Sequence, residues 1–362
     1  MADKSYKRDI DRKKVQKLAE HTIGFLTGAA VSGMIYLGDR MGLYQALDGA
    51  GPMTSEDLAL KTGLHERWLR EWLEGQATAG LIDYIGNRQF ELSPEAALVF
   101  ANENSPAFLA GGFCSLPQQI GVLEKLPKSF KTGLGLPYDA FGAEGARGIE
   151  RFLAPWFQAH LVPKALPALD GVVPKLEAGA AVADVGCGAG VALLKIAQAY
   201  PHTDCHGYDI SKHALARAEE NKAKAGVTNV TFHDANGDAI PDDKRFDFIT
   251  TFDCLHDMAN PTPVIQAIYN ALKPEGTWLI ADIHSLATFE ENLADNLLAP
   301  LLYGFSVMCC MSSSMSEPNG EGLGTLGFTE PVARKMVGGV GFSRFKRHDF
   351  DNPINAYYEV RP

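Results

Sequence analysis

The sequence predicts an α/β protein in which a mainly helical front part precedes a Rossmann-like domain built on a parallel sheet. At 362 residues the chain exceeds the size of one ordinary hydrophobic core, so we expect two domains. From residue 180 onward, short apolar runs alternate with helical stretches. Such alternation is typical of a parallel sheet covered by helices, whose ligands bind beyond the carboxyl ends of the strands.

Composition and charge restrict the class of partner. Hydrophobic residues make up 46% of the chain and charged residues 21%, which is typical of a folded globular protein. The net charge of −11 argues against a nucleic-acid partner, because affinity for phosphates comes mainly from Lys and Arg. We therefore expect a small or cationic ligand.

Cysteine spacing and apolar stretches indicate a cytoplasmic protein outside the membrane. The six cysteines show no CxxC spacing, so we expect free thiols, no disulfide and no metal site. The polar start of the chain predicts no secretory signal. The apolar stretches at 22–38 and 297–311 are diluted by glycine or broken by proline, so we expect buried or interface helices there.

Residues 45–105 show the succession helix, turn, helix and hairpin. Thr54 is placed to cap the first helix with Asp57 three residues later, and Gly63 separates the two helices. The Gly-Asn pair at 86–87 then reverses two short β-rich runs. Five apolar residues share one face of the second helix, and we expect this face in the core: Leu64, Trp68, Leu69, Trp72 and Leu73. The succession resembles a winged helix-turn-helix.

The charge of this segment argues against a DNA-binding role. Residues 45–105 contain ten acidic and four basic side chains. Phosphate would repel an acidic recognition helix. We therefore expect this domain to dimerise the chain or to shape a substrate site.

A helical connector is expected between the two domains. Glycine and proline interrupt the helical pieces of residues 106–175. Tyr138 and Phe141 are candidates for the mouth of a substrate pocket, although aromatic residues of a connector commonly only pack. The expected domains are thus 1–105, the connector 106–175, and a sheet domain 176–362 with a cap insertion at about 284–327.

A glycine-rich turn follows the first strand of the sheet domain. Gly186, Gly188 and Gly190 form GxGxG, whereas the dinucleotide fingerprint would place its third glycine at 191, where Val191 stands. Asp184 precedes the turn and would repel a pyrophosphate while attracting an amino group. Both features argue against a dinucleotide without excluding it.

Acidic residues end the next two strands. Asp209 lies 19 residues past Gly190, where a carboxylate accepts hydrogen bonds from the hydroxyls of a ribose. Both NAD and S-adenosylmethionine carry a ribose whose hydroxyls require such an acceptor. Asp234 ends the following strand and is placed to accept from an adenine amino group.

The motifs DVGCGAG, GYDI, HDAN, FDFITTFDCLHD and LKPEGTWLIADI follow one another in an order and spacing that resemble a class I S-adenosylmethionine-dependent methyltransferase. The resemblance implies that S-adenosylmethionine is the cofactor and that a hairpin of the last two strands closes the sheet. It implies contacts of Asp184 and the three glycines with the methionine part, of Asp209 with the ribose, and of Asp234 with Ala235 with the adenine. The expected cofactor set is completed by Cys187, Ile210 and Asp253.

The winged-helix front part adds a resemblance to two-domain small-molecule methyltransferases, including plant and polyketide O-methyltransferases. This resemblance implies a homodimer and a His-Asp pair after the fourth strand, which His256 and Asp257 match in CLHDM. An imidazole near its ordinary pKa of about 6.5 can take a hydroxyl proton, so His256 is the candidate base. A His at a strand end also commonly serves only to satisfy backbone groups, and the plant enzymes have HDW instead of HDM.

The cap insertion carries soft apolar side chains. Tyr303, Met308 and Met311 are candidates for a substrate cavity, with domain or dimer packing as the alternative. Cys309 and Cys310 are adjacent, and neighbouring helical side chains point about 100° apart. We therefore expect the two thiols not to share one metal site.

Taken together, these features predict an S-adenosylmethionine-dependent methyltransferase that acts on a small, partly apolar acceptor, most readily at oxygen. Methylation at nitrogen or carbon remains open as an alternative. A cofactor-binding regulator without catalysis is the second class, and an NAD-dependent oxidoreductase is the third. The complete glycine turn and the acidic strand ends favour the enzyme.

Overall fold

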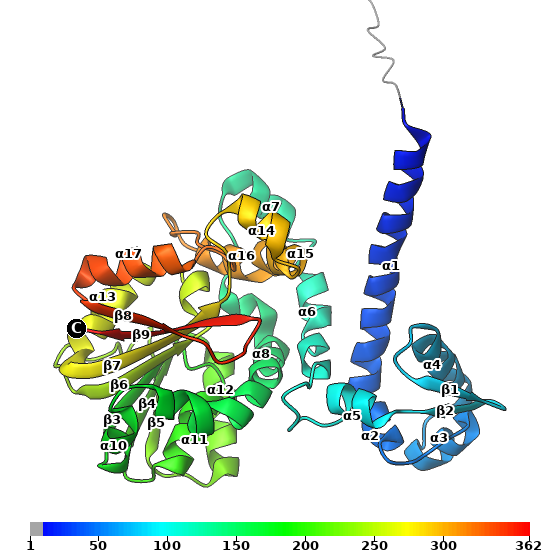
Figure 1. Ribbon diagram of the computed structural model, residues 1–362, viewed down its shortest axis with the longest axis horizontal. Coiled ribbons are helices and arrows are strands. Elements are labelled where there is room, and N and C mark those ends of the chain that lie inside the picture. Colours follow the sequence, from blue (N-terminus) through cyan, green and yellow to red (C-terminus); the bar gives the residue numbers. More distant parts are fainter. Residues whose placement is uncertain (1–9) are drawn as a thin grey trace, which may run out of the picture. The chain divides into compact units, whose positions relative to one another are not determined.

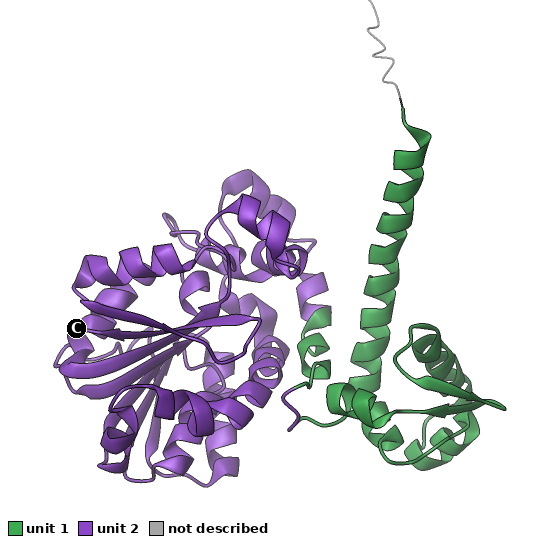
Figure 2. Cartoon of the chain, viewed as in Figure 1, with its two compact units in different colours: residues 1–103, 107–116 green, residues 104–106, 117–362 purple. Residues whose placement is uncertain are grey.

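The computed structural model describes residues 10–362, which divide into two compact units (Figures 1 and 2). Unit 1 comprises residues up to 103 together with 107–116, and unit 2 comprises 104–106 and 117–362. Most of the expected connector therefore packs with the sheet domain. No helix within residues 10–362 combines the length and apolar character needed to cross a membrane.

Unit 1 contains short helices and a two-stranded hairpin beside one long helix. Its elements are α1 (Arg12–Arg40), α2 (Leu43–Leu47), α3 (Ser55–Thr62), α4 (Glu66–Thr78), β1 (Asp83–Gly86), β2 (Gln89–Glu91), α5 (Pro94–Phe100) and the short η1 (Ala110–Phe113). Thr54 and Asp57 form the expected capping box, and Gly63 ends α3 at φ 72°. The predicted winged-helix arrangement is confirmed.

One expectation about burial in unit 1 was wrong. Leu69, Trp72 and Leu73 are buried, but Trp68 is 80% exposed and Leu64 precedes α4 and is 37% exposed. Both lie on the predicted apolar face, which is wider than the surface that the other helices of the unit cover. The apolar stretch 22–38 in α1 is mostly exposed within the chain, which leaves the expected interface helix as a prediction.

Unit 2 is built on a seven-stranded sheet of order β5-β4-β3-β6-β7-β9-β8 (Figure 1). Its strands are β3 (Ala181–Val185), β4 (Asp204–Asp209), β5 (Val230–Asp234), β6 (Phe246–Phe252), β7 (Leu272–Ile283), β8 (Arg344–His348) and β9 (Asn355–Arg361). The first five run parallel, and β9 pairs antiparallel with both β7 and β8. The predicted α/β class and the closing hairpin are confirmed.

Helices cover both faces of this sheet, which explains why its central strands β3 and β6 are almost wholly buried. The parallel strands are joined by α11 (Val191–Ala199), α12 (Lys212–Ala225), η4 (Leu255–Asp257) and α13 (Pro261–Ala271), and α17 (Glu330–Val340) precedes the closing hairpin. Two apolar clusters form, one containing Leu193 and Phe248 and the other containing Ile249 and Trp278. Because neighbouring residues of β6 enter different clusters, the core lies on both faces of the sheet.

Further helices of unit 2 lie before the sheet and in the insertion after β7. The former are α6 (Leu116–Gly121), α7 (Leu126–Thr132), η2 (Tyr138–Phe141), α8 (Gly142–Trp156), the π-helical η3 (Phe157–Ala165), α9 (Leu166–Ala168) and α10 (Val172–Glu177). The latter are α14 (Phe289–Asp295), α15 (Ala299–Phe305), the π-helical η5 (Ser306–Cys310) and α16 (Met311–Ser314). Gly135 donates its backbone N–H to the carbonyl of Met315 at 2.8 Å, so the two groups of helices meet.

Candidate active site

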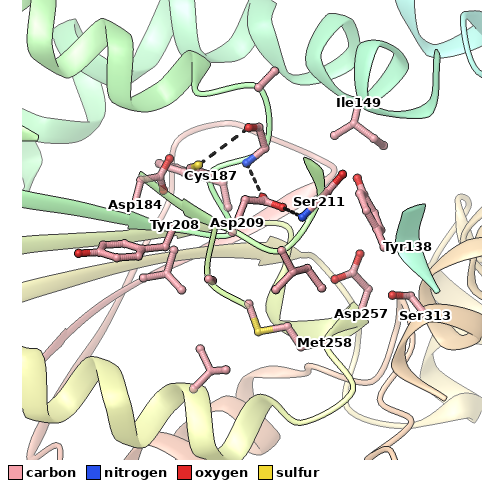
Figure 3. Close-up of a pocket in the computed structure, with 18 of the residues that line it drawn as sticks. Tyr138, Ile149, Asp184, Cys187, Tyr208, Asp209, Ser211, Asp257, Met258 and Ser313 are labelled. Carbon is pink, nitrogen blue, oxygen red and sulfur yellow. Dashed lines mark hydrogen bonds between the residues drawn. The ribbon is translucent and has the colours of Figure 1, made fainter. Parts of the chain in front are cut away.

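A cavity of about 520 Å³ lies beyond the carboxyl ends of the parallel strands in unit 2 (Figure 3). The turn after β3, the ends of β4 and β6 and the residues after β5 all contribute to its wall. Segments from the expected connector and the insertion complete it, represented by Tyr138 and Ser313 (Figure 3). This is the position at which a doubly wound sheet binds its ligands.

The glycine turn after β3 adopts a backbone that other residues would strain. Gly186, Gly188 and Gly190 have φ values of 73°, 55° and 74°. Gly186 and Gly188 line the cavity. A Cβ on Gly190 would stand 2.5 Å from the Phe232 ring. Gly190 is thus not part of the wall, and its role is to let the start of α11 pack on β5.

Asp209, at the end of β4, holds the glycine turn against the neighbouring strand. Its carboxylate accepts the backbone N–H of Gly188 and that of Ser211, both at 2.8 Å (Figure 3). Burial raises the pKa of Asp209, although these N–H groups oppose the rise by stabilising the charged form. A partly buried carboxylate with unused lone pairs therefore faces the cavity.

Asp184, within β3, is the most deeply buried carboxylate of the wall. It is 2% exposed, and its Oδ1 accepts a hydrogen bond from Thr250 Oγ1 at 2.7 Å. Burial raises its pKa to about 7, against this hydrogen bond. A cationic ligand would favour the charged form of Asp184 and so bind more tightly.

The cavity wall is acidic and has no basic side chain among the described residues, 10–362. Its acids are Asp139, Glu150, Asp184, Asp209, Asp257 and Glu317. Of these, Glu150 is neutralised by Arg217, with Nε and Oε2 2.6 Å apart. The remaining carboxylates favour a positively charged ligand and oppose a pyrophosphate.

A buried His-Asp pair lies next to the cavity. His256 Nδ1 and Asp282 Oδ1 are 2.6 Å apart, and the two side chains are 3% and 1% exposed. Burial opposes the charged imidazolium, but the carboxylate of Asp282 and the neighbouring Cys310 outweigh it and raise the pKa of His256 well above its usual value. An ionised carboxylate only accepts hydrogen bonds, so Nδ1 carries a proton and Nε2 is left for other partners.

Only one of the two predicted catalytic residues, Asp257, lines the cavity. Burial raises the pKa of its carboxyl well above the usual range. His256 is not part of the wall. A ring nitrogen of His256, a carboxylate oxygen of Asp257 and the sulfur of Cys310 lie within 4.8 Å of one another. Neither Asp282 nor Cys310 was a sequence candidate for the site. The strand end ADI gave a signal for Asp282, since acidic residues also end the neighbouring strands.

Seven of the ten expected cofactor residues meet at the cavity, and three, Gly190, Asp234 and Asp253, do not. Cys187, Ile210 and Ala235 line it, as do Asp184, Asp209 and the first two glycines. Asp234 is exposed, and its Oδ1 accepts from the backbone and side-chain amides of Asn236 at 3.0 and 2.8 Å. Asp253, at φ 49°, accepts a hydrogen bond from Asn355 of β9. Burial raises its pKa to about 7.

Of the expected substrate residues, only Tyr138 lines the cavity. Phe141 is buried, and Tyr303 stacks edge-on with Phe289 at 6.2 Å between ring centres. Met308 and Met311 belong to the π-helical turn and α16 of the insertion, away from the wall. The insertion contributes Ser313, Ser316 and Glu317 in their place.

Comparison with known proteins agrees with this geometry. Residues 176–309 match a family model described as a methyltransferase domain, and residues 29–102 match one described as an Rv2258c-like winged HTH domain. The fold and the strand-end site thus agree with a methyltransferase domain at residues 176–309, preceded by a winged-helix domain at residues 29–102. The predicted resemblance is confirmed at this level.

Individual relatives are O-methyltransferases by name. The ubiquinone biosynthesis O-methyltransferase of Methylococcus capsulatus is 33% identical over 28% of this chain and 42% of its own length. The mitomycin biosynthesis 6-O-methyltransferase of Streptomyces lavendulae is 28% identical over 51% of this chain and 54% of its own. The chain thus spans about half the length of these curated relatives. The crystal structure of human N-acetylserotonin methyltransferase in complex with SAM shares the fold at a TM-score of 0.69 and 17% identity, over 100% of this chain and 99% of that one.

Proposed function

We propose that this protein is an S-adenosylmethionine-dependent methyltransferase that methylates a hydroxyl oxygen of a small, partly apolar molecule. The observation that carries the proposal is the acidic cavity at the carboxyl ends of β3 and β4, whose wall has no basic side chain within residues 10–362. The match of residues 176–309 to a methyltransferase domain supports it, as do the O-methyltransferases among the relatives.

The residues present fit this cofactor. The paired hydroxyls of a ribose would donate to Asp209, whose carboxylate two backbone N–H groups already orient. Asp184 would attract the ammonium group of the methionine part, while Ala235 and Ile210 offer backbone and apolar contacts to the adenine ring. When bound, the cofactor supplies an electrophilic methyl group on a positively charged sulfur. That charge suits the acidic wall.

NAD fits the same wall less well. Its pyrophosphate needs cationic or N–H partners, and Asp184 stands at the start of the turn that would hold it. The third glycine of the dinucleotide fingerprint is also replaced by Val191, which lines the cavity. We therefore keep the oxidoreductase only as an arm of the test.

The acceptor's class follows from the remaining wall. Ile149, Leu153, Phe157, Met258 and Val264 are apolar and line the cavity with Tyr138. Such a surface fits a ring or a short aliphatic body, and exclusion of water around it would favour methyl transfer over hydrolysis. The names of the relatives favour oxygen over nitrogen or carbon as the methylated atom.

Within this proposal His256 is the base. Asp282 accepts the hydrogen bond from Nδ1–H, so Nε2 of the neutral ring can take the hydroxyl proton of an acceptor that lies against Asp257. Because the pKa of His256 is raised, turnover is expected to increase with pH as the ring loses its charge. The substitution His256→Ala is expected to lower turnover by about 10²–10⁴ with little change in cofactor affinity. A parallel Asp257→Asn variant separates the two neighbours. If only Asp257→Asn loses turnover, the base is Asp257.

The cofactor is tested by the melting temperature with S-adenosylhomocysteine and, separately, with NADH. At about 100 times the dissociation constant a ligand adds ~2.7 kcal/mol, which shifts the transition by several degrees. A shift with NADH alone would refute the proposed cofactor. Transfer of a labelled methyl group to a panel of small hydroxyl compounds then distinguishes the enzyme from a cofactor-binding regulator.

We further propose that the protein is a cytoplasmic homodimer whose winged-helix unit takes part in assembly and not in DNA binding. The exposed apolar side chains of α1 support assembly, among them Ile23 at 61%, Phe25 at 62% and Leu26 at 69%. Light scattering is expected to give twice the mass of the 362-residue chain. A monomer at micromolar concentration would contradict the proposal.

A further inference from the structure

We propose that His256, Asp257 and Cys310 form a binding site for a transition-metal ion of the zinc class at the edge of the cavity. The three side chains offer one nitrogen, one oxygen and one sulfur atom, all within 4.8 Å of one another. Within residues 10–362, no other group of three or more His, Cys, Asp or Glu side chains brings its ligand atoms this close together.

The donor set has the composition of a catalytic zinc site. Zinc binds imidazole nitrogen, carboxylate oxygen and thiolate sulfur at about 2.0–2.3 Å, usually with three protein ligands and one open position. Ligand atoms around such an ion lie roughly 3.3–4 Å apart, so small rotations of Asp257 and Cys310 close the remaining gap. Because Asp257 also lines the cavity, the open position faces the space where a substrate would lie.

The surroundings of His256 are arranged as they are around a metal-bound histidine. Asp282 holds Nδ1–H at 2.6 Å, which fixes the ring and leaves the Nε2 lone pair to the cluster. A carboxylate behind the histidine is the usual support of such ligands. Figure 3 shows the carboxylate of Asp257 beside Tyr138, on which it also acts electrostatically.

Charge around the cluster favours a cation. Asp282 acts electrostatically on both His256 and Asp257, and Asp253 acts on His256. The adjoining cavity wall has no basic side chain within residues 10–362. The Cys310 thiol loses its proton to the solvent as the metal–sulfur bond forms, so binding of the ion releases one proton from this ligand. No oxidant or reductant takes part in this step.

Occupation of the metal site would affect the proposed methyl transfer. This consequence, unlike the metal site itself, rests on the proposed function. The ion would use the same Nε2 lone pair that is needed to accept a hydroxyl proton. Zinc is therefore expected to inhibit methyl transfer reversibly, and a chelator to restore it.

The test uses the full chain after treatment with a chelator and titration with Zn²⁺ or Co²⁺, without cofactor or acceptor. One equivalent of Co²⁺ is expected to give a thiolate-to-cobalt charge-transfer band that Zn²⁺ abolishes. Cys310→Ser is expected to remove the band and to weaken Zn²⁺ binding at least tenfold, and Asp282→Asn to weaken it by about 10–100-fold. Cys309→Ser, at the adjacent thiol outside the cluster, is the matched control and should keep both.

Absence of the band in the wild-type chain, or equal Zn²⁺ affinity in Cys310→Ser, would overturn the site. Loss of binding in Cys309→Ser alone would move the ligand to the other thiol and overturn the assignment as well. Circular dichroism of each variant checks that it is folded. Because S-adenosylhomocysteine binding is measured separately, failure of the metal site and failure of the proposed function are distinguishable.

Discussion

Replacing Asp184 with Asn is expected to stabilise the fold while it weakens the cofactor site. The carboxyl is 2% exposed, and burial raises its pKa from 3.8 to about 7. A raised acid pKa means that the folded state binds the proton more tightly than the unfolded state. The charged carboxylate therefore costs stability above the unfolded value of 3.8, and this cost grows until the pH passes about 7.

The magnitude follows from the shift. A rise of about three pKa units corresponds to roughly 4 kcal/mol above pH 7, and to about 1.5 kcal/mol at pH 5. Asn carries no charge, and its Oδ1 still accepts the hydrogen bond from Thr250. Asp184→Asn should thus melt several degrees higher than the wild type at pH 8, with a smaller difference at pH 5.

The same variant should bind S-adenosylhomocysteine more weakly, because the ligand's ammonium group loses its counter-charge. In the wild type this affinity is expected to rise with pH up to about 7 and then to level off, since a cation favours ionised Asp184. Calorimetric titration and thermal melting at pH 5 and pH 8 measure both effects. The exposed acid Asp295, in the same unit, provides the control Asp295→Asn. The reasoning is refuted if the melting difference is independent of pH or if Asp184→Asn is the less stable form at pH 8.

Three further substitutions test other parts of the structure. Gly190→Ala places a Cβ 2.5 Å from the Phe232 ring at a φ of 74°. The melting temperature should therefore fall by an amount equivalent to about 1–3 kcal/mol of unfolding free energy. An unchanged melting temperature would contradict the packing role of Gly190. Asp282→Asn removes the negative charge beside His256 and lets an amide N–H compete as donor to Nδ1, so turnover should fall by about 10²-fold or more at unchanged KM for the cofactor. An equal loss of cofactor affinity would indicate a general structural defect. Tyr44→Phe removes the hydroxyl that donates to the buried Gln76 Oε1 at 2.5 Å. The free energy of unfolding of unit 1, measured in urea, should fall by about 1–3 kcal/mol. An unchanged free energy would mean that the Gln76 amide oxygen finds another donor.

Patterns that are local in the chain could be predicted from the sequence. The capping box of α3, the glycine turn after β3 and the closing hairpin all lie where their residues indicate. Their physical causes act over a few residues: a side chain caps its own helix, and glycine permits positive φ. Period and alternation likewise determined the α/β class, because a strand buried on both faces consists mostly of apolar residues.

Burial of single side chains was less predictable. The apolar face of α4 was recognised, yet Trp68 on that face is 80% exposed. Asp234 ends its strand as expected, but its carboxylate bonds within its own loop to Asn236. Sequence position places a residue at the edge of the sheet, whereas the direction of its side chain depends on competing local partners.

The sequence by itself determined the parallel sheet, the glycine turn and the acids that end β3 and β4, because each depends on neighbouring residues and on the common edge that parallel strands share. Only the tertiary structure decided that Asp282 supports His256 from the next strand, that Cys310 approaches from the insertion, and that Tyr138 joins the wall from the connector. These contacts join residues from tens to more than a hundred positions apart. Closing such loops depends on how the helices pack on the sheet, and no spacing within one segment records that.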